Sequence, residues 1–185
     1  RRQRQMCIRD SITFELDSPD GDQGYPGAVH IEVTYTLTED NAVKIAYHAV
    51  PDADTLINMT NHSYFNMDGH ASGDVLDQEV WIDADAFTRA DAESIPTGEI
   101  TPVEGTPMDF RTATPVGARI DDFDFVQLKN GNGYDHNWVL NTQRDITHKC
   151  VTLESPKTGI VLDVYTNEPG IQAVSYTHLR AHETD

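Results

Sequence analysis

Residues 29–37 read Val29-His30-Ile31-Glu32-Val33-Thr34-Tyr35-Thr36-Leu37, and residues 43–48 read Val43-Lys44-Ile45-Ala46-Tyr47-His48. In both runs apolar residues alternate with polar or small ones, which is the period of a β-strand with one buried face. The polar run Thr38-Glu39-Asp40-Asn41 separates them. The sequence therefore predicts an antiparallel hairpin with one buried, apolar face. His30 and His48 fall on its polar face, where a solvated side chain is expected.

The remainder of the chain carries strand signals in shorter pieces. Short apolar runs between turn residues predict further strands, at residues 78–83, 138–140, 149–154 and 160–165. The last two form a second hairpin around Ser155-Pro156-Lys157-Thr158-Gly159.

Helical signals are weak throughout. Pro96, Gly98 and Pro102 argue against a helix of any length between residues 86 and 105. A brief helical turn is expected to begin within residues 121–125. Many short strands and little helix predict an all-β fold, an antiparallel β-sandwich.

The composition limits the classes of partner. The chain has 185 residues, 31 of them acidic and 13 basic, for a formal charge of −18. Nucleic acids and anionic membrane surfaces bind clustered Lys and Arg, so we expect neither partner. No apolar run approaches the roughly 20 residues that cross a bilayer. Cys7 and Cys150 are too few for a disulfide framework, which favours a cytoplasmic location; a secreted or periplasmic form stays an alternative.

Both ends differ in character from the acidic body. A DNA sequence that encodes Met6-Cys7-Ile8-Arg9-Asp10 encodes Val174-Ser175-Tyr176-Thr177-His178 when it is read on the opposite strand. This relationship is typical of translated adapter sequence from library preparation, and such segments are left out of fold reasoning. We therefore predict foreign segments at residues 1–11 and 174–185, and one partial domain over residues 12–173.

The candidate site begins with Asn58-Met59-Thr60-Asn61-His62-Ser63-Tyr64-Phe65-Asn66-Met67-Asp68-Gly69. Asn, Ser and Thr side chains beside a histidine can fix its tautomer and bind hydroxylated ligands. The rings of Tyr64 and Phe65 can pack on a sugar or fill a core. By residue type alone, a loop with a satisfied histidine is the more frequent interpretation.

The run Thr60-Asn61-His62-Ser63-Tyr64-Phe65-Asn66 resembles the signature of the aldose 1-epimerase (galactose mutarotase) family. Asp20-Gly21-Asp22-Gln23-Gly24-Tyr25-Pro26-Gly27, Ser94-Ile95-Pro96-Thr97-Gly98-Glu99 and Pro107-Met108-Asp109-Phe110-Arg111 are similar to other segments of that family. The resemblance covers about the middle half of a complete mutarotase. It implies an incomplete galactose mutarotase-like sandwich.

The resemblance also implies a reaction, the interconversion of α and β anomers of free aldoses by general acid–base catalysis. His62 matches the family's proton donor. Asp135, in Gly133-Tyr134-Asp135-His136-Asn137, and Gln172, after Pro169-Gly170-Ile171, match residues that bind the sugar. The implied partner is a monosaccharide. No metal or organic cofactor is expected, because the reaction has no hydride or carbanion to stabilise.

The chain departs from the family in what it omits. A complete mutarotase has an arginine and a second histidine upstream, and a glutamate general base downstream. Neither Glu154 nor Glu168 lies in the motif of that base, so this chain is expected to be nearly inactive.

Three alternatives stay open. A non-catalytic carbohydrate-binding sandwich of the same superfamily would lack the downstream glutamate. A sugar-phosphate enzyme would need clustered Arg or Lys, and the eight basic residues of residues 12–173 show no cluster. A metal site of His62, Asp135 and His136 has no supporting ligand spacing. His136 itself is left out of the sugar site, because neighbours in a strand point to opposite faces.

Overall fold

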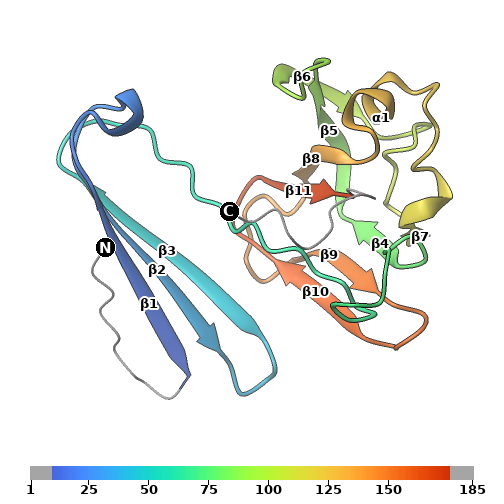
Figure 1. The fold of residues 1–185 in the computed structure, drawn as a ribbon, viewed down its shortest axis with the longest axis horizontal. Helices are drawn as coiled ribbons and strands as arrows, with labels where there is room; N and C mark the ends of the chain where they lie inside the picture. The colour runs from blue at the N-terminus through green and yellow to red at the C-terminus, as the bar shows by residue number, and fades with distance from the viewer. Residues whose placement is uncertain (1–9, 176–185) are drawn as a thin grey trace. The chain divides into compact units, whose positions relative to one another are not determined.

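The computed structural model describes residues 10–175, which form β-strands with one short α-helix (Figure 1). The chain divides into two compact units, Arg1–Ser63 and Tyr64–Asp185. The predicted foreign segments, residues 1–11 and 174–185, lie outside the described residues apart from two residues at each inner end. Cys7 also lies outside them. No helix within residues 10–175 is long and apolar enough to cross a membrane.

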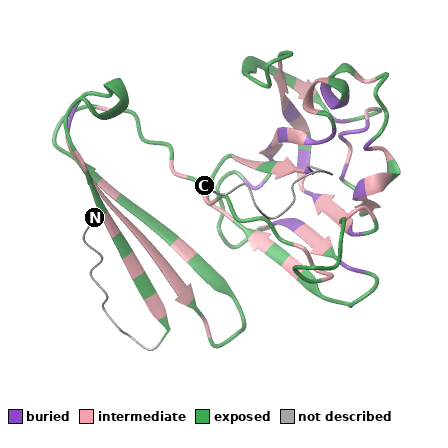
Figure 2. Cartoon of the chain, in the orientation of Figure 1, coloured by how far each residue is buried: buried purple, intermediate pink, exposed green. Residues whose placement is uncertain are grey.

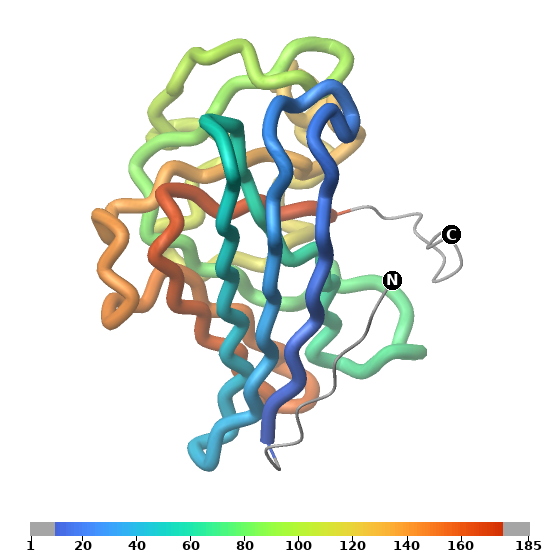
Figure 3. Tube along the Cα trace, turned by 90° about the vertical axis from the view of Figure 1, so that its left-hand side faces the viewer, coloured from blue at the N-terminus to red at the C-terminus, as the bar shows by residue number. Residues whose placement is uncertain are grey.

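The first unit is a three-stranded antiparallel sheet of β1 (Ser11–Ser18), β2 (Val29–Leu37) and β3 (Val43–Pro51), which run side by side in that order (Figure 3). The predicted hairpin of β2 and β3 is confirmed. The strand β1 was not predicted, although Ile12, Phe14 and Leu16 alternate there with polar residues. The one-turn 3-10 helix Asp22–Gly24 lies in the β1–β2 loop.

Within the first unit, no second layer of described residues covers the apolar face of this sheet. Pairing aligns Phe14 with Val33 and Val33 with Tyr47, so the apolar side chains do share one face. Phe14 is nevertheless 39% exposed and Tyr47 38%, and every described residue of β2 and β3 is exposed or half-buried (Figure 2). The described part of this unit contains one sheet, and a sheet face is buried only by a second packed layer.

The second unit contains two four-stranded antiparallel sheets. One has the order β10-β9-β4-β7, and the other has the order β11-β8-β5-β6. The bounds are β4 (Glu79–Ile82), β5 (Ala84–Ala90), β6 (Pro96–Pro102), β7 (Thr114–Pro115), β8 (Asp135–Leu140), β9 (Lys149–Glu154), β10 (Val161–Tyr165) and β11 (Gly170–Val174). The 3-10 turn Val116–Ala118 and α1 (Val126–Gly131) connect β7 to β8.

Both sheets supply side chains to one hydrophobic core. Ile82 of β4, Phe87 of β5, Trp138 of β8 and Cys150 of β9 are each at most 1% exposed and belong to the same buried cluster. The indole N–H of Trp138 donates to the carbonyl of Met108 at 3.0 Å, so the one polar atom of the ring is satisfied. The predicted antiparallel, sandwich-type fold is confirmed.

The element predictions in this unit have mixed outcomes. The strands β4, β8, β9 and β10 match predicted strands, whereas β5, β6, β7 and β11 were not predicted. A helical turn was expected to begin within residues 121–125, and α1 begins at the next residue, Val126, with Phe125 as its N-cap. Prolines at both ends of β6 are unfavourable for a strand, so this strand was not predicted from the sequence. They are tolerated because β6 is an edge strand, where a missing N–H leaves no partner unpaired.

Candidate functional site

His62 lies at the end of the first unit, in a stretch without regular secondary structure, and its side chain is exposed. The adjacent Asn61 holds this stretch. Its amide donates to the hydroxyl of Tyr35 on β2 at 2.8 Å, and its carbonyl oxygen accepts the N–H of Ser63 at 3.0 Å. The first half of the signature is thereby attached to the sheet of its own unit, and the imidazole is accessible.

Buried polar side chains hold residues 66–68, at the end of the signature and just beyond it. The amide of Gln78, 1% exposed, donates to Asn66 Oδ1 at 2.7 Å and accepts the N–H of Met67 at 3.2 Å. The hydroxyl of Ser155, which is fully buried, donates to the carboxylate of Asp68. Buried polar atoms are costly without partners, so these contacts specify one conformation for Asn66 to Asp68. Sequence reasoning did not identify Gln78 or Ser155, because neither lies in a motif.

Asp135 and Gln172, the two predicted sugar-binding residues of the second unit, lie together. Asp135 begins β8, and Gln172 lies on the neighbouring strand β11, opposite Asn137. The Gln172 Nε2 group donates to Asp135 Oδ1 at 2.8 Å. Asp135 is half-buried and Gln172 is exposed, so both can be reached by a ligand. A carboxylate accepts several hydrogen bonds, and those to a charged acceptor are stronger than neutral ones.

His136 points into the core, as predicted from strand alternation. It is 3% exposed, and its ring lies edge-on to Phe87 with centroids 6.0 Å apart. Its Nδ1 accepts the backbone N–H of Asp135 at 3.1 Å. Burial lowers the pKa of His136 below its ordinary value. His136 therefore acts as a neutral core residue that supports the strand under Asp135.

The metal alternative has no geometric support in the part of the chain that the structure describes. Within residues 10–175, no group of three or more His, Cys, Asp or Glu side chains is placed to hold a metal ion.

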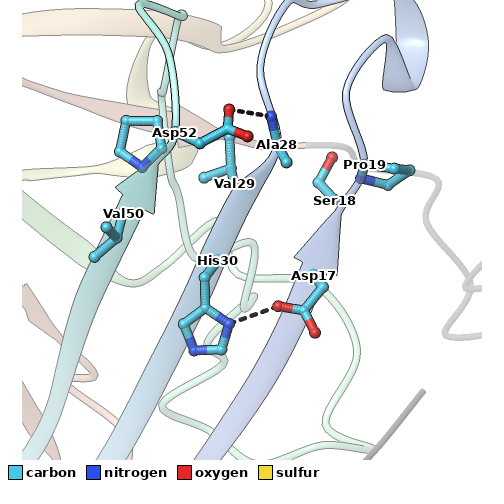
Figure 4. Close-up of a pocket in the computed structure, with 9 residues that line it drawn as sticks. Asp17, Ser18, Pro19, Ala28, Val29, His30, Val50 and Asp52 are labelled. Carbon is cyan, nitrogen blue, oxygen red and sulfur yellow. Dashed lines mark hydrogen bonds and ion pairs between the residues drawn. The ribbon is translucent and has the colours of Figure 1, made fainter.

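A shallow hollow lies in the first unit at one end of its sheet (Figure 4). It is lined by Asp17, Ser18, Pro19, Ala28, Val29, His30, Val50, Pro51 and Asp52. His30 is not simply solvated, because its Nδ1 lies 2.7 Å from Asp17 Oδ1. That hydrogen bond raises the pKa of His30 above its ordinary value. None of the predicted site residues lines this hollow. A second hollow, between β1–β3 and the start of the signature, includes Met59 and Thr60.

Comparisons with known proteins agree with this fold and these motifs. A family model described as Aldose 1-epimerase matches residues 1–183. The chain is 42% identical over 165 residues to the galactose mutarotase of Sus scrofa, covering 89% of this chain and 46% of that protein. It is 38% identical over 183 residues to the aldose 1-epimerase of Haemophilus influenzae, covering 97% of this chain and 52% of the relative.

A solved structure is similar over the same extent. The galactose 1-epimerase from Lactobacillus acidophilus NCFM matches with a TM-score of 0.80 and 28% sequence identity, covering 95% of this chain and 50% of that one. The chain thus spans about half the length of the curated relatives it matches. The family match extends over nearly all of its residues, and the chain therefore belongs to the aldose 1-epimerase family.

Proposed function

We propose that the protein, in its complete form, interconverts the α and β anomers of free aldoses such as galactose or glucose. The observation that supports this most strongly is the contact between Gln172 and Asp135, together with membership of the family. Sugar hydroxyls donate to carboxylates and accept from amides, and this pair offers both kinds of group on one sheet face.

In this proposal His62 is the proton donor. It protonates the ring oxygen of the sugar while a general base takes the proton of the C1 hydroxyl, and the ring opens to the aldehyde. Rotation about the C1–C2 bond presents the other carbonyl face, and reclosure in the reverse sense gives the other anomer. Imidazole suits the role because it gains and loses a proton near neutral pH. Asp135 and Gln172 hold the hydroxyls while the ring is open.

The general base is proposed to lie in the part of the relatives' length that this chain does not cover. Glu154 and Glu168 do not match the motif of that base, and the remaining sugar-binding residues of the family are also outside the match. The 185-residue chain is therefore proposed to be nearly inactive on its own. The proposed location is the cytoplasm, in keeping with the two cysteines.

Polarimetry with α-D-galactose tests the assignment of the acid. The full-length protein, recovered with its flanking reading frame, should accelerate equilibration. His62→Ala should lower that rate by about 10²–10⁴-fold. His70→Ala, which removes an exposed histidine eight residues away, is the matched control and should leave the rate unchanged. Undiminished activity of His62→Ala would overturn the role of His62.

The same assay on the 185-residue chain tests the location of the base. Full turnover by this chain would show that the base lies within it. Binding of galactose by the full-length protein without any acceleration of mutarotation would favour the non-catalytic carbohydrate-binding alternative.

A further inference from the structure

The strand face that carries Asp135 presents one more polar side chain, Asn137. Along β8, Asp135, Asn137 and Val139 are half-buried, whereas the residues between them are buried, so these three share the outer face. Gln172 lies directly opposite Asn137 in the antiparallel register, on the same face. Asn137 is therefore a neighbour of both proposed sugar-binding residues, on rigid strands rather than on a loop.

The orientation of the Asn137 amide is determined by a third strand. Its Nδ2 group donates to the hydroxyl of Thr88 on β5 at 3.0 Å. A carboxamide has its NH₂ group and its carbonyl oxygen on opposite sides, so an NH₂ group directed to β5 turns the oxygen toward β11. The hydrogen-bond network thus defines which end of the amide faces which strand.

Gly170 on β11 leaves the space that this orientation needs. A Cβ atom at position 170 would lie 2.4 Å from Asn137 Oδ1 and 2.9 Å from Nδ2, far inside contact distance. Gly170 does not have a positive φ, so its backbone does not require glycine. Glycine is therefore needed at position 170 because it has no side chain, and not because of its backbone conformation.

We propose that Asn137 is a third sugar-contacting residue. Thr88 is its positioning residue, and the missing side chain of Gly170 leaves room for the Asn137 amide. An amide that presents a donor and an acceptor matches two neighbouring hydroxyls of a pyranose, one of which accepts while the other donates. Asp135 supplies only acceptors when ionised, and the Nε2 group of Gln172 already donates to it, so Asn137 adds a second amide donor to this face. The inference rests on the proposed substrate class, but it does not depend on the role of His62.

The direct test follows the side-chain NH₂ resonances of the 185-residue chain by ¹⁵N NMR during titration with D-galactose. The Asn137 and Gln172 NH₂ signals should both shift and yield one dissociation constant. Movement of the Gln172 signals without those of Asn137 would overturn the inference and leave the substrate class standing. Absence of any galactose-dependent shift at Asn137 would also overturn it. The polarimetric assay of His62→Ala decides the proposed catalysis separately.

Variants separate contact with the sugar from a purely structural role. Asn137→Ala should raise the dissociation constant for galactose about threefold to tenfold, which is the range expected for one lost neutral hydrogen bond. Thr88→Val keeps the shape of residue 88 but removes the acceptor of the Asn137 amide. This variant should raise the dissociation constant for galactose about threefold. Gly170→Ala should act in the same direction as Asn137→Ala.

The matched control is Asn141→Ala. Asn141 is an exposed asparagine just beyond β8 whose amide donates to Asp83 at 3.0 Å, away from the proposed site. Its removal should leave galactose binding unchanged. If Asn137→Ala lowers the unfolding midpoint while the dissociation constant stays at the wild-type value, Asn137 is structural and the inference is wrong.

Discussion

Gln172 on β11 donates a hydrogen bond of 2.8 Å to Asp135 on β8, and the two residues are 37 positions apart in the sequence. The contact is diagonal across the strand pair, since Gln172 is directly opposite Asn137 and Asp135 is opposite Val174. It holds one carboxylate oxygen in place, so the ordered carboxylate meets a sugar without first losing side-chain freedom.

Replacing Gln172 tests this preorganisation. Gln172→Leu keeps much of the side-chain volume but removes the donor to Asp135. We expect KM for galactose in the full-length protein to rise roughly fivefold, since one exposed hydrogen bond to a charged group is lost, while kcat changes less. Steady-state polarimetry separates the two constants. Gln143→Leu, at an exposed position, is the control, and a fall in kcat alone would contradict the proposed binding role.

Gln78 contacts the end of the signature through its buried amide, and Gln127, whose amide is equally buried but contacts another segment, is the matched control. Gln127 is 2% exposed and makes two hydrogen bonds of 2.8 Å to the backbone of Ala90, as Gln78 makes two to Asn66 and Met67. Gln78→Met and Gln127→Met should each lower the free energy of unfolding by about 1–3 kcal/mol, because the half-buried partners of each amide lose their hydrogen bonds. Urea unfolding measures this change.

Amide hydrogen exchange distinguishes the two variants. The N–H of Met67 should exchange faster only in Gln78→Met, and that of Ala90 only in Gln127→Met, because each loses its own acceptor. Equal acceleration of both amides in either variant would show general loosening rather than a local restraint on the signature.

His30 is expected to titrate above its ordinary pKa of 6.5, chiefly because of its hydrogen bond with Asp17. A raised folded-state pKa means that this contribution to stability is fully present below pH 6.5 and is lost as the pH rises through the folded-state value. Asp17→Asn should move the pKa of His30 back toward 6.5, as measured by NMR titration of the ring. Asp40→Asn, at an exposed position in the β2–β3 turn, should leave the pKa of His30 unchanged. High salt should reduce the shift, because the pair is solvent-accessible.

His136 is expected to titrate in the opposite direction, below 6.5, because burial disfavours its charged form. Protonation at Nδ1 would also remove the acceptor for the N–H of Asp135. With the folded-state pKa lowered, the unfolded chain binds more protons below about pH 6.5. This part of the stability is therefore present above that pH and is lost as the pH falls toward the folded-state pKa. Urea unfolding at pH 7.5 and pH 5 should show a smaller acid-induced loss in His136→Phe than in the wild type. An equal loss in both would contradict this account.

Alternation of side chains by itself was enough to define the β2–β3 hairpin, the inward face of His136 and the β9–β10 hairpin. This information is local, since in a strand every second side chain points to the same face. The motif around His62 and the segments near Asp135 and Gln172 indicated the family for a similar reason, because each is a short contiguous run. The acidic composition argued against nucleic-acid and anionic membrane partners without reference to any fold, and that expectation stays a prediction.

Other features depended on which strands become neighbours. The unpredicted β5 is rich in alanine, and β11 begins with Gly170, so neither has a strong strand composition. The hydrogen bonds of Asn137 to Thr88, Gln172 to Asp135 and Gln78 to Asn66 join residues brought together by strand pairing and loop packing. Periodicity specifies which face a side chain takes but not which partner faces it. The motifs therefore named the family and three candidate residues, and only the tertiary structure decided that Asn137 and Gly170 lie beside two of them.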